Sequence, residues 1–462
     1  MLTRPMLRAR PYNKNPGKVD AYTRLRRLID NRKATVGILG LGPVGLHLAC
    51  GIATGAGLQV IGFDTNASRL QLLAKGKSYL SDLPATVIAK LVKNGHLIPT
   101  GDFSRAHDAD VLIICVQTPL NEHREPDLSH VENAARTLLA YARSGQLIVL
   151  ESTTYPGTTR DVLGNILGQR GLTLGEDLFL AFSPDRHDPG NTRFTLATTP
   201  KVVGGEGRRA LDLACRFYGT FIKDVTPVSS ADTAEAVKLT ENIFRAVNIS
   251  LANELKVLFT AMGIDIWEVM EAAATKPYGF MPFYPGPGMG GHCIPIDPFY
   301  LSWKARAFGL SARFVELAGD IDMSMPKYIV DQMSKAFNER WGRGLKGANV
   351  LVVGVAYKKN VNDLREAPSI AVIRTLRKRG ARVSYYDPLV SVLPAHDGAD
   401  PMPELRSADW SPKRFAKYDA ALIVTDQEEV DYEVLVENSQ LVIDTRNACG
   451  SRGITSPKIV KA

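Results

Sequence analysis

Cys293 differs from the other cysteines because of the segment that contains it. Residues 286–298 hold four glycines and three prolines, and so many residues with special backbone preferences predict a fixed loop, not the interior of a helix or strand. A thiol in such a loop can be exposed and activated as a nucleophile, whereas a structural cysteine favours an apolar wall. Asp297 follows four residues later and could place a carboxylate beside the thiol. A buried cysteine in a rigid turn is the alternative interpretation.

Lys238 and Asn242 are a second candidate pair. They lie four residues apart in a stretch, 230–262, whose apolar residues recur mostly at a spacing of three to four. This spacing predicts one long helix with both side chains on the same face. A cation and an amide side by side suit the stabilisation of a developing oxyanion. A solvated helix face is the alternative.

A third candidate site is a glycine-rich turn between a predicted strand and a predicted helix. Gly40, Gly42 and Gly45 have the GxGxxG spacing. This spacing permits a tight turn, a close approach of the backbone to a pyrophosphate, and close packing of the helix on the strand. The helix N-terminus would offer free N–H groups to the phosphates, and Val44 lies within the turn. The turn therefore predicts a dinucleotide site; a turn that binds nothing is the alternative.

Asp64 ends the next predicted strand, 19 residues after Gly45. An acid at this place can bind a ribose 2′-hydroxyl and repels a 2′-phosphate, which favours NAD over NADP. Arg69 could cover the phosphate side of the adenosine or be an ordinary surface arginine. Thr118 and Thr153 follow two further strands, at the edge where parallel sheets bind ligands; either could instead serve only as a helix cap.

These residues need a framework of alternating strands and helices to position them. Buried strands are predicted at 35–40, 59–64, 111–116, 146–150, 179–183 and 201–205, and again at 349–354, 382–387, 420–425 and 440–444. Strands that alternate with helices predict parallel sheets. Both halves also repeat a strand that ends in Asp after a glycine turn. We therefore predict an α/β fold with two Rossmann-like doubly wound domains joined by a long central helix.

The 462 residues are too many for one ordinary core, so several domains are expected. The predicted division is a basic N-terminal extension with a lead-in helix (1–33), an NAD-binding Rossmann domain (34–228), a helical central and dimerisation domain (229–335) and a second Rossmann-like domain (336–462). Further helices are predicted at 298–340 and 368–379. The apolar row of the long helix is expected to be core or dimer contact, and it comprises Val237, Ile243, Val247, Leu251, Leu255 and Leu258.

Composition excludes several classes of protein. The net charge is +8, but the first 33 residues contain ten Lys or Arg against two Asp, and no aromatic-basic module accompanies this tail, so nucleic acid is not an expected partner. No apolar run approaches the roughly 20 residues of a membrane span. The five cysteines are scattered without a CxxC pair, which predicts reduced thiols, no disulfide framework and no metal site. A cytoplasmic protein is expected.

Together, these motifs resemble the UDP-glucose/GDP-mannose dehydrogenase family, the nucleotide-sugar 6-dehydrogenases, over residues 31–450. The segments that carry the resemblance are 40–45, 117–120, 152–154, 182–185, 236–242, 290–293 and 364–368. Two further segments, 183–191 and 272–286, are similar to the branch that oxidises UDP-N-acetylglucosamine to its uronic acid, a precursor of surface polysaccharide.

The resemblance implies an NAD-dependent, four-electron oxidation of a sugar C6 alcohol. Cys293 would form a thiohemiacetal and then a thioester, which water hydrolyses. Lys238 and Asn242 would hold the C6 oxygen, Asp297 would act as a base or orient a water, and Thr153 would position a water.

Further site residues are implied only by the resemblance. Asp185 would act in acid–base chemistry, although the family usually has the longer Glu there, which puts this role in doubt. The usual Tyr and Pro of the glycine turn are replaced by Pro43 and His47 without loss of a glycine. The second Rossmann-like domain would bind the uridine diphosphate. Substrate contacts would come from Arg186, Tyr284, Gly288, Lys358 and Arg446; solvated charges at strand ends are the alternative for the last two.

Three other functions stay open at this point. The substrate could be UDP-glucose, UDP-N-acetylmannosamine, UDP-N-acetylgalactosamine or a GDP-linked sugar. A β-hydroxyacid dehydrogenase shares the domain plan but performs a single hydride transfer and needs no cysteine. A non-enzymatic dinucleotide-binding scaffold is a third possibility. A homodimer or higher homo-oligomer is expected from the long helix and from the resemblance.

Overall fold

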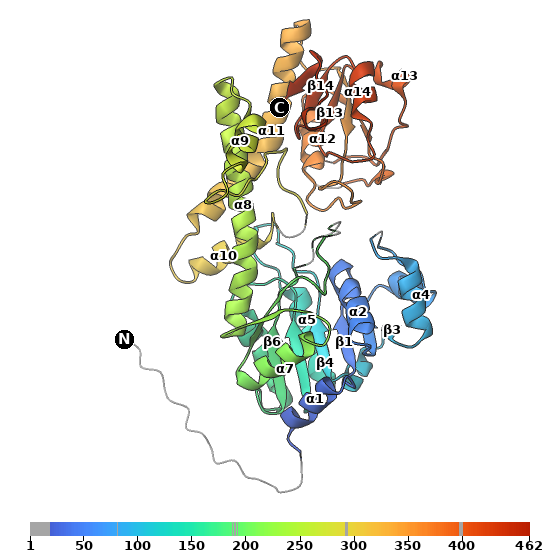
Figure 1. Ribbon diagram of the computed structural model, residues 1–462, viewed down its shortest axis with the longest axis vertical. Helices are drawn as coiled ribbons and strands as arrows, with labels where there is room; N and C mark the ends of the chain where they lie inside the picture. Colours follow the sequence, from blue (N-terminus) through green and yellow to red (C-terminus); the bar gives the residue numbers. More distant parts are fainter. Residues whose placement is uncertain are drawn as a thin grey trace.

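The computed structural model describes residues 19–80, 82–186, 188, 191, 193–291, 294–396 and 401–462. Two α/β units lie at opposite ends of a column of long helices (Figure 1). The predicted fold class, two doubly wound α/β units joined by a long helix, is confirmed.

The first unit contains an eight-stranded sheet with the order β3-β2-β1-β4-β5-β6-β7-β8. All neighbours are parallel except β6 and β7. The order reverses between β1 and β4, and such a switch point opens a ligand crevice at the carboxyl ends of the strands. The strands are β1 Val36–Leu39, β2 Val60–Phe63, β3 Leu97–Thr100, β4 Val111–Ile114, β5 Gln146–Leu150, β6 Leu178–Phe182, β7 Lys201–Gly205 and β8 Val225–Val228.

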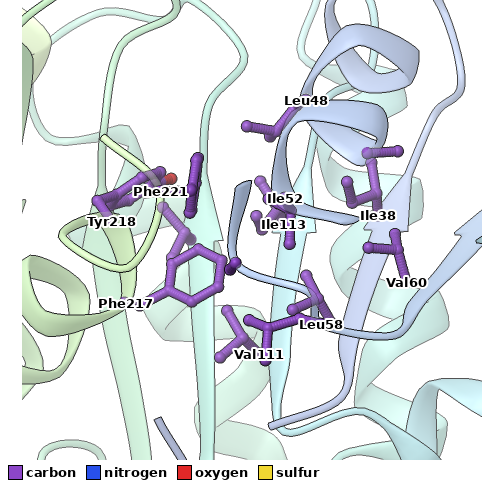
Figure 2. Close-up of a cluster of buried hydrophobic side chains, with 14 of the residues drawn as sticks. Ile38, Leu48, Ile52, Leu58, Val60, Val111, Ile113, Phe217, Tyr218 and Phe221 are labelled. Atoms are coloured by element: carbon purple, nitrogen blue, oxygen red, sulfur yellow. The ribbon is translucent and has the colours of Figure 1, made fainter. Parts of the chain in front are cut away.

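Helices cover both faces of this sheet. Figure 2 shows one of the two apolar layers, in which α2 and the aromatic end of α7 pack over β1, β2 and β4. Burial on both faces of the sheet explains why the amino-acid sequences of these strands are continuous apolar runs. The helices are α1 Ala21–Asp30, α2 Pro43–Gly55, α3 Ala67–Ala74, α4 Ala85–Lys93, α5 Ser129–Tyr141, α6 Gly164–Leu167 and α7 Arg208–Tyr218, with shorter turns at Phe103–Asp108, Thr158–Leu163 and Gly168–Arg170.

Four helices form the column between the two units: α8 Ala231–Ala261, α9 Ile266–Ala274, α10 Asp297–Arg306 and α11 Arg313–Trp341. The long helix predicted at 230–262 is confirmed by α8. The helical stretch predicted at 298–340 consists of two helices, α10 and α11. Gly309, with φ of 71°, lies in the left-handed region between them and ends α10, as glycine commonly does after a helix.

The apolar row of α8 is only partly buried. Leu251 and Leu258 are 48% and 47% exposed. The face that packs on α11 carries small residues, and Ser250 donates its hydroxyl to the Ala318 carbonyl of α11 at 2.8 Å. Small side chains let two helices approach closely, so the larger apolar residues of α8 remain on the outside.

The second unit contains a five-stranded, entirely parallel sheet with the order β10-β9-β13-β14-β15. A two-stranded ribbon, β11 Val392–Leu393 and β12 Leu405–Arg406, lies outside it. The strands are β9 Asn349–Val353, β10 Arg382–Tyr386, β13 Ala420–Ile423, β14 Val442–Asp444 and β15 Ile459–Lys461, and the helices are α12 Pro368–Lys378, α13 Pro412–Phe415 and α14 Tyr432–Asn438, with a 3₁₀ turn at Gly450–Arg452.

No helix in the described part of the chain is both long and apolar enough to cross a membrane. The cysteines at 50, 115, 215 and 449 are free thiols.

Candidate active site

The glycine turn after β1 leaves open space at one position only. Gly40 has φ of 92°, and a Cβ there would lie 2.6 Å from the Cys115 carbonyl oxygen; a Cβ on Gly45 would collide with the Gly40 carbonyl. A Cβ on Gly42 would have nothing within 4 Å. Gly42 directly precedes the first turn of α2, which contains Val44, so the free N–H groups of a helix N-terminus face this space. The turn therefore fits the pyrophosphate of a dinucleotide.

Asp64 lies beside this turn at the end of β2. It is 7% exposed, and its carboxylate accepts hydrogen bonds from the backbone N–H groups of Leu41 at 2.9 Å and Asn66 at 2.8 Å. The Arg69 guanidinium lies 3.6 Å from the carboxylate and stacks over the Tyr79 ring at 5.5 Å. Asp64 and Arg69, the two residues predicted to bind the adenosine part of NAD, therefore lie next to each other beside the glycine turn.

The turns after β4 and β5 are tied to each other and to α10. The Ser152 hydroxyl donates to the Val116 carbonyl at 2.8 Å, and the Tyr300 hydroxyl donates to the Thr118 carbonyl at 2.9 Å. Thr118 is buried, and Thr153 is half-buried in the turn after β5. Both threonines therefore lie at the carboxyl edge of the sheet, as predicted.

Lys238 and Asn242 are buried, which excludes the alternative of a solvated helix face. Lys238 is 6% exposed and Asn242 is 1% exposed. The Lys238 ammonium donates to the main-chain carbonyl of Asp185 at 2.5 Å. The Asn242 amide donates to the Asp297 carboxylate at 2.5 Å. One face of α8 thus binds two distant segments: Asp185 lies 53 residues before Lys238, and Asp297 lies 55 residues after Asn242.

Asp297 is the first residue of α10 and is 2% exposed. Burial raises the pKa of Asp297 to about 7, against the opposing effects of the Lys238 cation, the Asn242 amide and the Arg245 cation. Arg245 also donates to the Asn242 side-chain oxygen at 2.5 Å and was not predicted. Its position three residues after Asn242, on the same helix face, was the available signal.

Cys293 and His292 lie outside the described residues. The loop before them does have unusual backbone geometry, with φ of 128° at Gly288 and 88° at Gly291. A Cβ on Gly290 would lie 2.7 Å from the Tyr357 Cβ atom and 2.9 Å from the Glu366 carbonyl oxygen. The glycines are therefore required because the second α/β unit packs directly on this loop.

Gly288 lines a cavity of about 1020 Å³ between the two units. Its walls include residues after β4, residues on both sides of the cysteine loop, α11 and the start of α12. Asp322 of α11 accepts a hydrogen bond from the Met289 N–H at 2.5 Å and so fixes this wall. Burial raises the pKa of Asp322 to about 6.

Arg186 and Tyr284 contact other protein groups. Arg186 donates to the Pro200 carbonyl at 2.8 Å and pairs with Glu241 of α8. The Tyr284 ring is 43% exposed and stacks on Trp267 of α9, with a centroid distance of 5.8 Å. Neither contact brings these two side chains to Asp297 or Asn242.

The sequence matches the UDP-glucose/GDP-mannose dehydrogenase family in three consecutive parts: the NAD binding domain over residues 34–222, the central domain over 232–324 and the UDP binding domain over 351–451. The chain belongs to this family. It is an NAD-dependent nucleotide-sugar dehydrogenase, and NAD is its cofactor.

Individual relatives differ in the sugar that their names specify. A UDP-N-acetyl-D-glucosamine 6-dehydrogenase of Pseudomonas aeruginosa is 36% identical over 358 residues, 77% of this chain and 83% of that protein. An NDP-N-acetyl-D-galactosaminuronic acid dehydrogenase of Ralstonia nicotianae is 31% identical over 442 residues, 93% of this chain and all of that protein. The structure of a UDP-D-ManNAc dehydrogenase from Pyrococcus horikoshii has a TM-score of 0.81 and 30% identity, covering 92% of this chain and 96% of that one.

In this dehydrogenase, Lys358 and Arg446 belong to the UDP binding domain. Lys358 forms an ion pair of 2.7 Å with Asp188, which joins the two units. Arg446 is half-buried, and its guanidinium donates to the Val424 carbonyl at 3.2 Å. Burial lowers the pKa of Arg446 to about 10. The guanidinium lies against Gly286, where a Cβ would collide with it, so Arg446 is directed at the loop that leads to Cys293.

We expect Gly42→Ala to weaken NAD binding at least about tenfold, which corresponds to roughly 1.4 kcal/mol, because its methyl group would occupy the space beside the helix N-terminus. The melting temperature should not change, since a Cβ at this position meets no protein atom. Calorimetric titration with NAD measures the effect. Gly168→Ala is the matched control, because its Cβ would also meet nothing within 4 Å. Unchanged NAD affinity in Gly42→Ala would contradict the assignment.

We expect Asp297→Asn to lower kcat by about 10²-fold, the usual contribution of an acid–base group. Because the folded pKa of Asp297 lies above its ordinary value, the folded chain binds more protons than the unfolded chain between about pH 4 and 7. The contribution of this residue to stability therefore falls as the pH rises through that window. The melting temperature of the variant minus that of the wild type should therefore be larger at pH 8 than at pH 5. Asp320→Asn, exposed on α11, is the control; wild-type kcat in Asp297→Asn would contradict the role.

Proposed function

We propose that the protein oxidises the C6 hydroxyl of UDP-N-acetylglucosamine to the carboxylate, in two NAD-dependent steps that pass through Cys293. The observation that supports this most is the buried group Lys238, Asn242 and Asp297. A cation, an amide and a carboxyl group with a pKa of about 7 meet there, at the start of the helix that follows the cysteine loop. Burying these groups costs free energy, which argues for a chemical role.

The chemistry follows from the needs of each step. NAD accepts a hydride in each oxidation. In the first, the C6 hydroxyl loses its proton to a base and its hydride to the cofactor, which gives an aldehyde. The Cys293 thiolate then adds to the aldehyde carbon to form a thiohemiacetal, whose carbon can lose a second hydride. The resulting thioester is cleaved by water, which releases the carboxylate and restores the thiol.

The residues around Asp297 have distinct parts in this scheme. Lys238 and Asn242 stabilise the oxygen that becomes negative when the thiolate adds, because donors already fixed in a dry site stabilise developing charge strongly. Asp297 takes up a proton near neutral pH, where a general base is most effective if its pKa lies near the working pH. Thr153 positions the hydrolytic water from the turn after β5.

Asp185 has a less direct place in the scheme. Lys238 binds its main-chain carbonyl, so the segment after β6 is fixed against α8 whatever the length of the side chain. We therefore assign the acid–base role to Asp297, with Asp185 as an auxiliary acid that the fixed backbone brings to the same edge of the sheet.

The acetamido sugar is proposed from segments 183–191 and 272–286 and from the 36% identical relative that acts on UDP-N-acetyl-D-glucosamine. His187, Pro189 and Gly190 lie outside the described residues. The other sugars stay alternatives, since relatives named for N-acetylmannosamine and N-acetylgalactosaminuronic acid are nearly as similar. The product would be a building block for surface polysaccharide.

A panel of nucleotide sugars tests the proposal. UDP-N-acetylglucosamine should give the highest kcat/KM and two NADH per sugar, and Cys293→Ser should form no acid product. A single NADH per sugar with full activity in Cys293→Ser would instead identify a one-step hydroxyacid-type dehydrogenase. A clear preference for UDP-glucose would contradict the acetamido assignment, and no turnover of any nucleotide sugar would contradict the proposed reaction.

We also propose that the enzyme is a homodimer or higher homo-oligomer through α8. Phe244, Leu251, Leu258 and Met262 recur at spacings of seven and four on this helix, and each is at least 47% exposed. An exposed apolar row of this length marks an interaction surface, and the same row on a second copy would cover it.

Leu251→Glu combined with Leu258→Glu should lower the mass in solution to that of one chain, because each substitution places a charge in the proposed interface. Light scattering coupled to size-exclusion chromatography measures this mass. Leu72→Glu, on α3 and 36% exposed, should leave the mass unchanged. A wild-type chain that is monomeric at micromolar concentration would contradict the proposal.

A further inference from the structure

Glu235 is a buried carboxylate of α8 that the proposed reaction does not use. Its side chain is fully buried. It lies three residues before Lys238 and seven before Asn242, so all three side chains share one face of the helix. Lys238 and Asn242 hold the segments that contain Asp185 and Asp297, whereas Glu235 holds a third segment.

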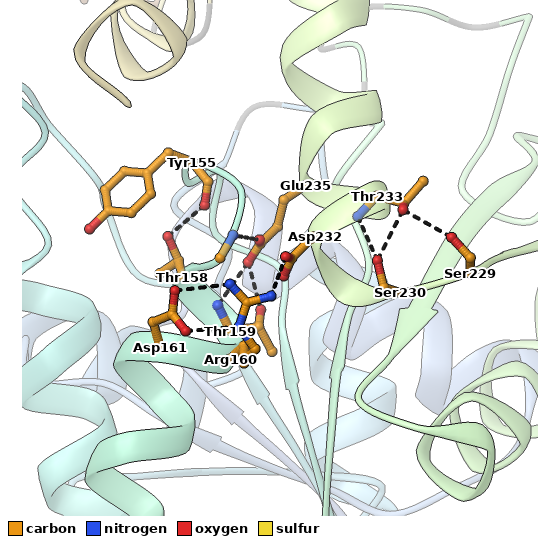
Figure 3. A network of polar contacts seen from close by, with 11 residues as sticks. Tyr155, Thr158, Thr159, Arg160, Asp161, Ser229, Ser230, Asp232, Thr233 and Glu235 are labelled. Carbon is orange, nitrogen blue, oxygen red and sulfur yellow. Dashed lines mark hydrogen bonds and ion pairs between the residues drawn. The ribbon is translucent and has the colours of Figure 1, made fainter. Parts of the chain in front are cut away.

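That third segment is the turn that follows Thr153. Glu235 accepts hydrogen bonds from the backbone N–H of Gly157 at 2.6 Å, and from both the backbone N–H and the hydroxyl of Thr159 at 2.8 Å each. Figure 3 shows these three contacts from the turn converging on the carboxylate at the start of α8. Both carboxylate oxygens therefore have partners in the same short turn.

The turn is restrained by its backbone conformation, by an internal hydrogen bond and by burial. Gly157 has φ of 101°, in the left-handed region, and the Thr158 hydroxyl donates to the Tyr155 carbonyl at 2.7 Å. Thr154, Thr158 and Thr159 are fully buried. Only three residues separate Thr153 from Gly157, so a shift of Gly157 would move Thr153 as well.

We propose that Glu235 is a positioning residue for the dehydrogenation: its carboxylate fixes α8 against the turn at 153–159 and thereby sets Lys238 and Asn242 relative to Thr153. This inference rests on the roles proposed above for Lys238 and Asn242. Glu235 touches neither of those two groups, and it acts through the helix backbone.

The arrangement requires a hydrogen-bond acceptor at both oxygens of the Glu235 side chain. The two backbone N–H groups can only donate, so they require an acceptor on each carboxylate oxygen. An amide side chain would place an N–H₂ group against one of the two N–H groups and open that contact. Burial raises the pKa of Glu235 to about 7. Burial thus favours the protonated form of the carboxyl group, whereas the hydrogen bonds from Thr159 and Gly157 favour the ionised form.

A second link between the same segments offers a matched control. Arg160 of the turn pairs with Asp232 of α8, and it also pairs with Asp161 at 2.8 Å. The Arg160 and Asp232 side chains are 53% and 32% exposed. Exposed ion pairs contribute little to stability. This surface link crosses between the same elements as Glu235, but without desolvated donors, so its loss should not move α8.

The decisive experiment is a double-mutant cycle with kcat as the readout. Glu235→Gln, Lys238→Ala, the double variant and Asp232→Asn are assayed with NAD and UDP-N-acetylglucosamine, or with whichever panel sugar is oxidised fastest. Glu235→Gln should lower kcat about ten- to a hundredfold, because a misplacement near 1 Å can cost that much. Both KM values should stay within about threefold of wild type. Asp232→Asn should match the wild type.

The double variant separates positioning from general destabilisation. If Glu235 acts by placing Lys238, its substitution should change kcat less than about threefold once Lys238 is already Ala, since coupled residues are not additive. Equal losses in both backgrounds, or wild-type kcat in Glu235→Gln, would overturn the inference. Wild-type kcat in Lys238→Ala would instead refute the proposed role of Lys238 itself.

Two further variants keep the test valid if Glu235→Gln does not fold. Glu235→Asp keeps the charge but is one methylene shorter, and it should retain more kcat than an uncharged side chain. Thr159→Val removes one of the three donors while both backbone donors remain, and it should lower kcat by about threefold. Wild-type kcat in both variants would overturn the inference.

Discussion

Charged and amide groups cannot be buried along a helix unless other parts of the chain supply partners, because an unpaired polar group inside a protein costs several kcal/mol. On α8 this requirement applies three times on one face. Glu235 takes its donors from the turn after β5, Lys238 takes its acceptor from the segment after β6, and Asn242 takes its acceptor from the first residue of α10. Three segments far apart in sequence are therefore bound to the same helix. This helix positions the sheet edge and the start of α10 relative to each other.

The two α/β units share a strand–turn–strand pattern, but the aspartate that ends the second strand has a different role in each. In both, an aspartate at the end of the second strand accepts a hydrogen bond from the glycine turn: Asp64 from Leu41 and Asp387 from Val355. Asp387 is also bonded by further backbone N–H groups and by the Gln427 amide, so its oxygens are occupied by protein. Asp64 has fewer protein partners and retains acceptor capacity for a ribose. The second unit has thus kept the architecture of a dinucleotide site while its acid has become part of the fold.

The sequence was most informative where burial acts on many consecutive residues. The central strands and α8 were predicted because apolar runs and helical spacing are local signals. The edge strands β3 and β8 were not predicted, since Pro99 and Pro227 and exposed polar positions weaken the pattern. Within the site, GxGxxG and Asp64 were recognisable from spacing. Glu235 was missed because its donors come from a turn more than 70 residues away in the sequence. Arg245 was missed although its position three residues after Asn242 is a local signal. The role of Cys293, which lies outside the described residues, stays a prediction.

The reversal of direction between β6 and β7 has an evolutionary consequence. Phe182 pairs with Gly204 across antiparallel strands, so the segment between them leaves the sheet and returns to it at the same edge. Its two ends are adjacent in space, and the entropic cost of closing a loop grows only by about 0.6 kcal/mol for each doubling of its length. Insertions and deletions in this segment can therefore accumulate without strain on the parallel core. Such changes in length leave the strands that carry the glycine turn and Asp64 in place.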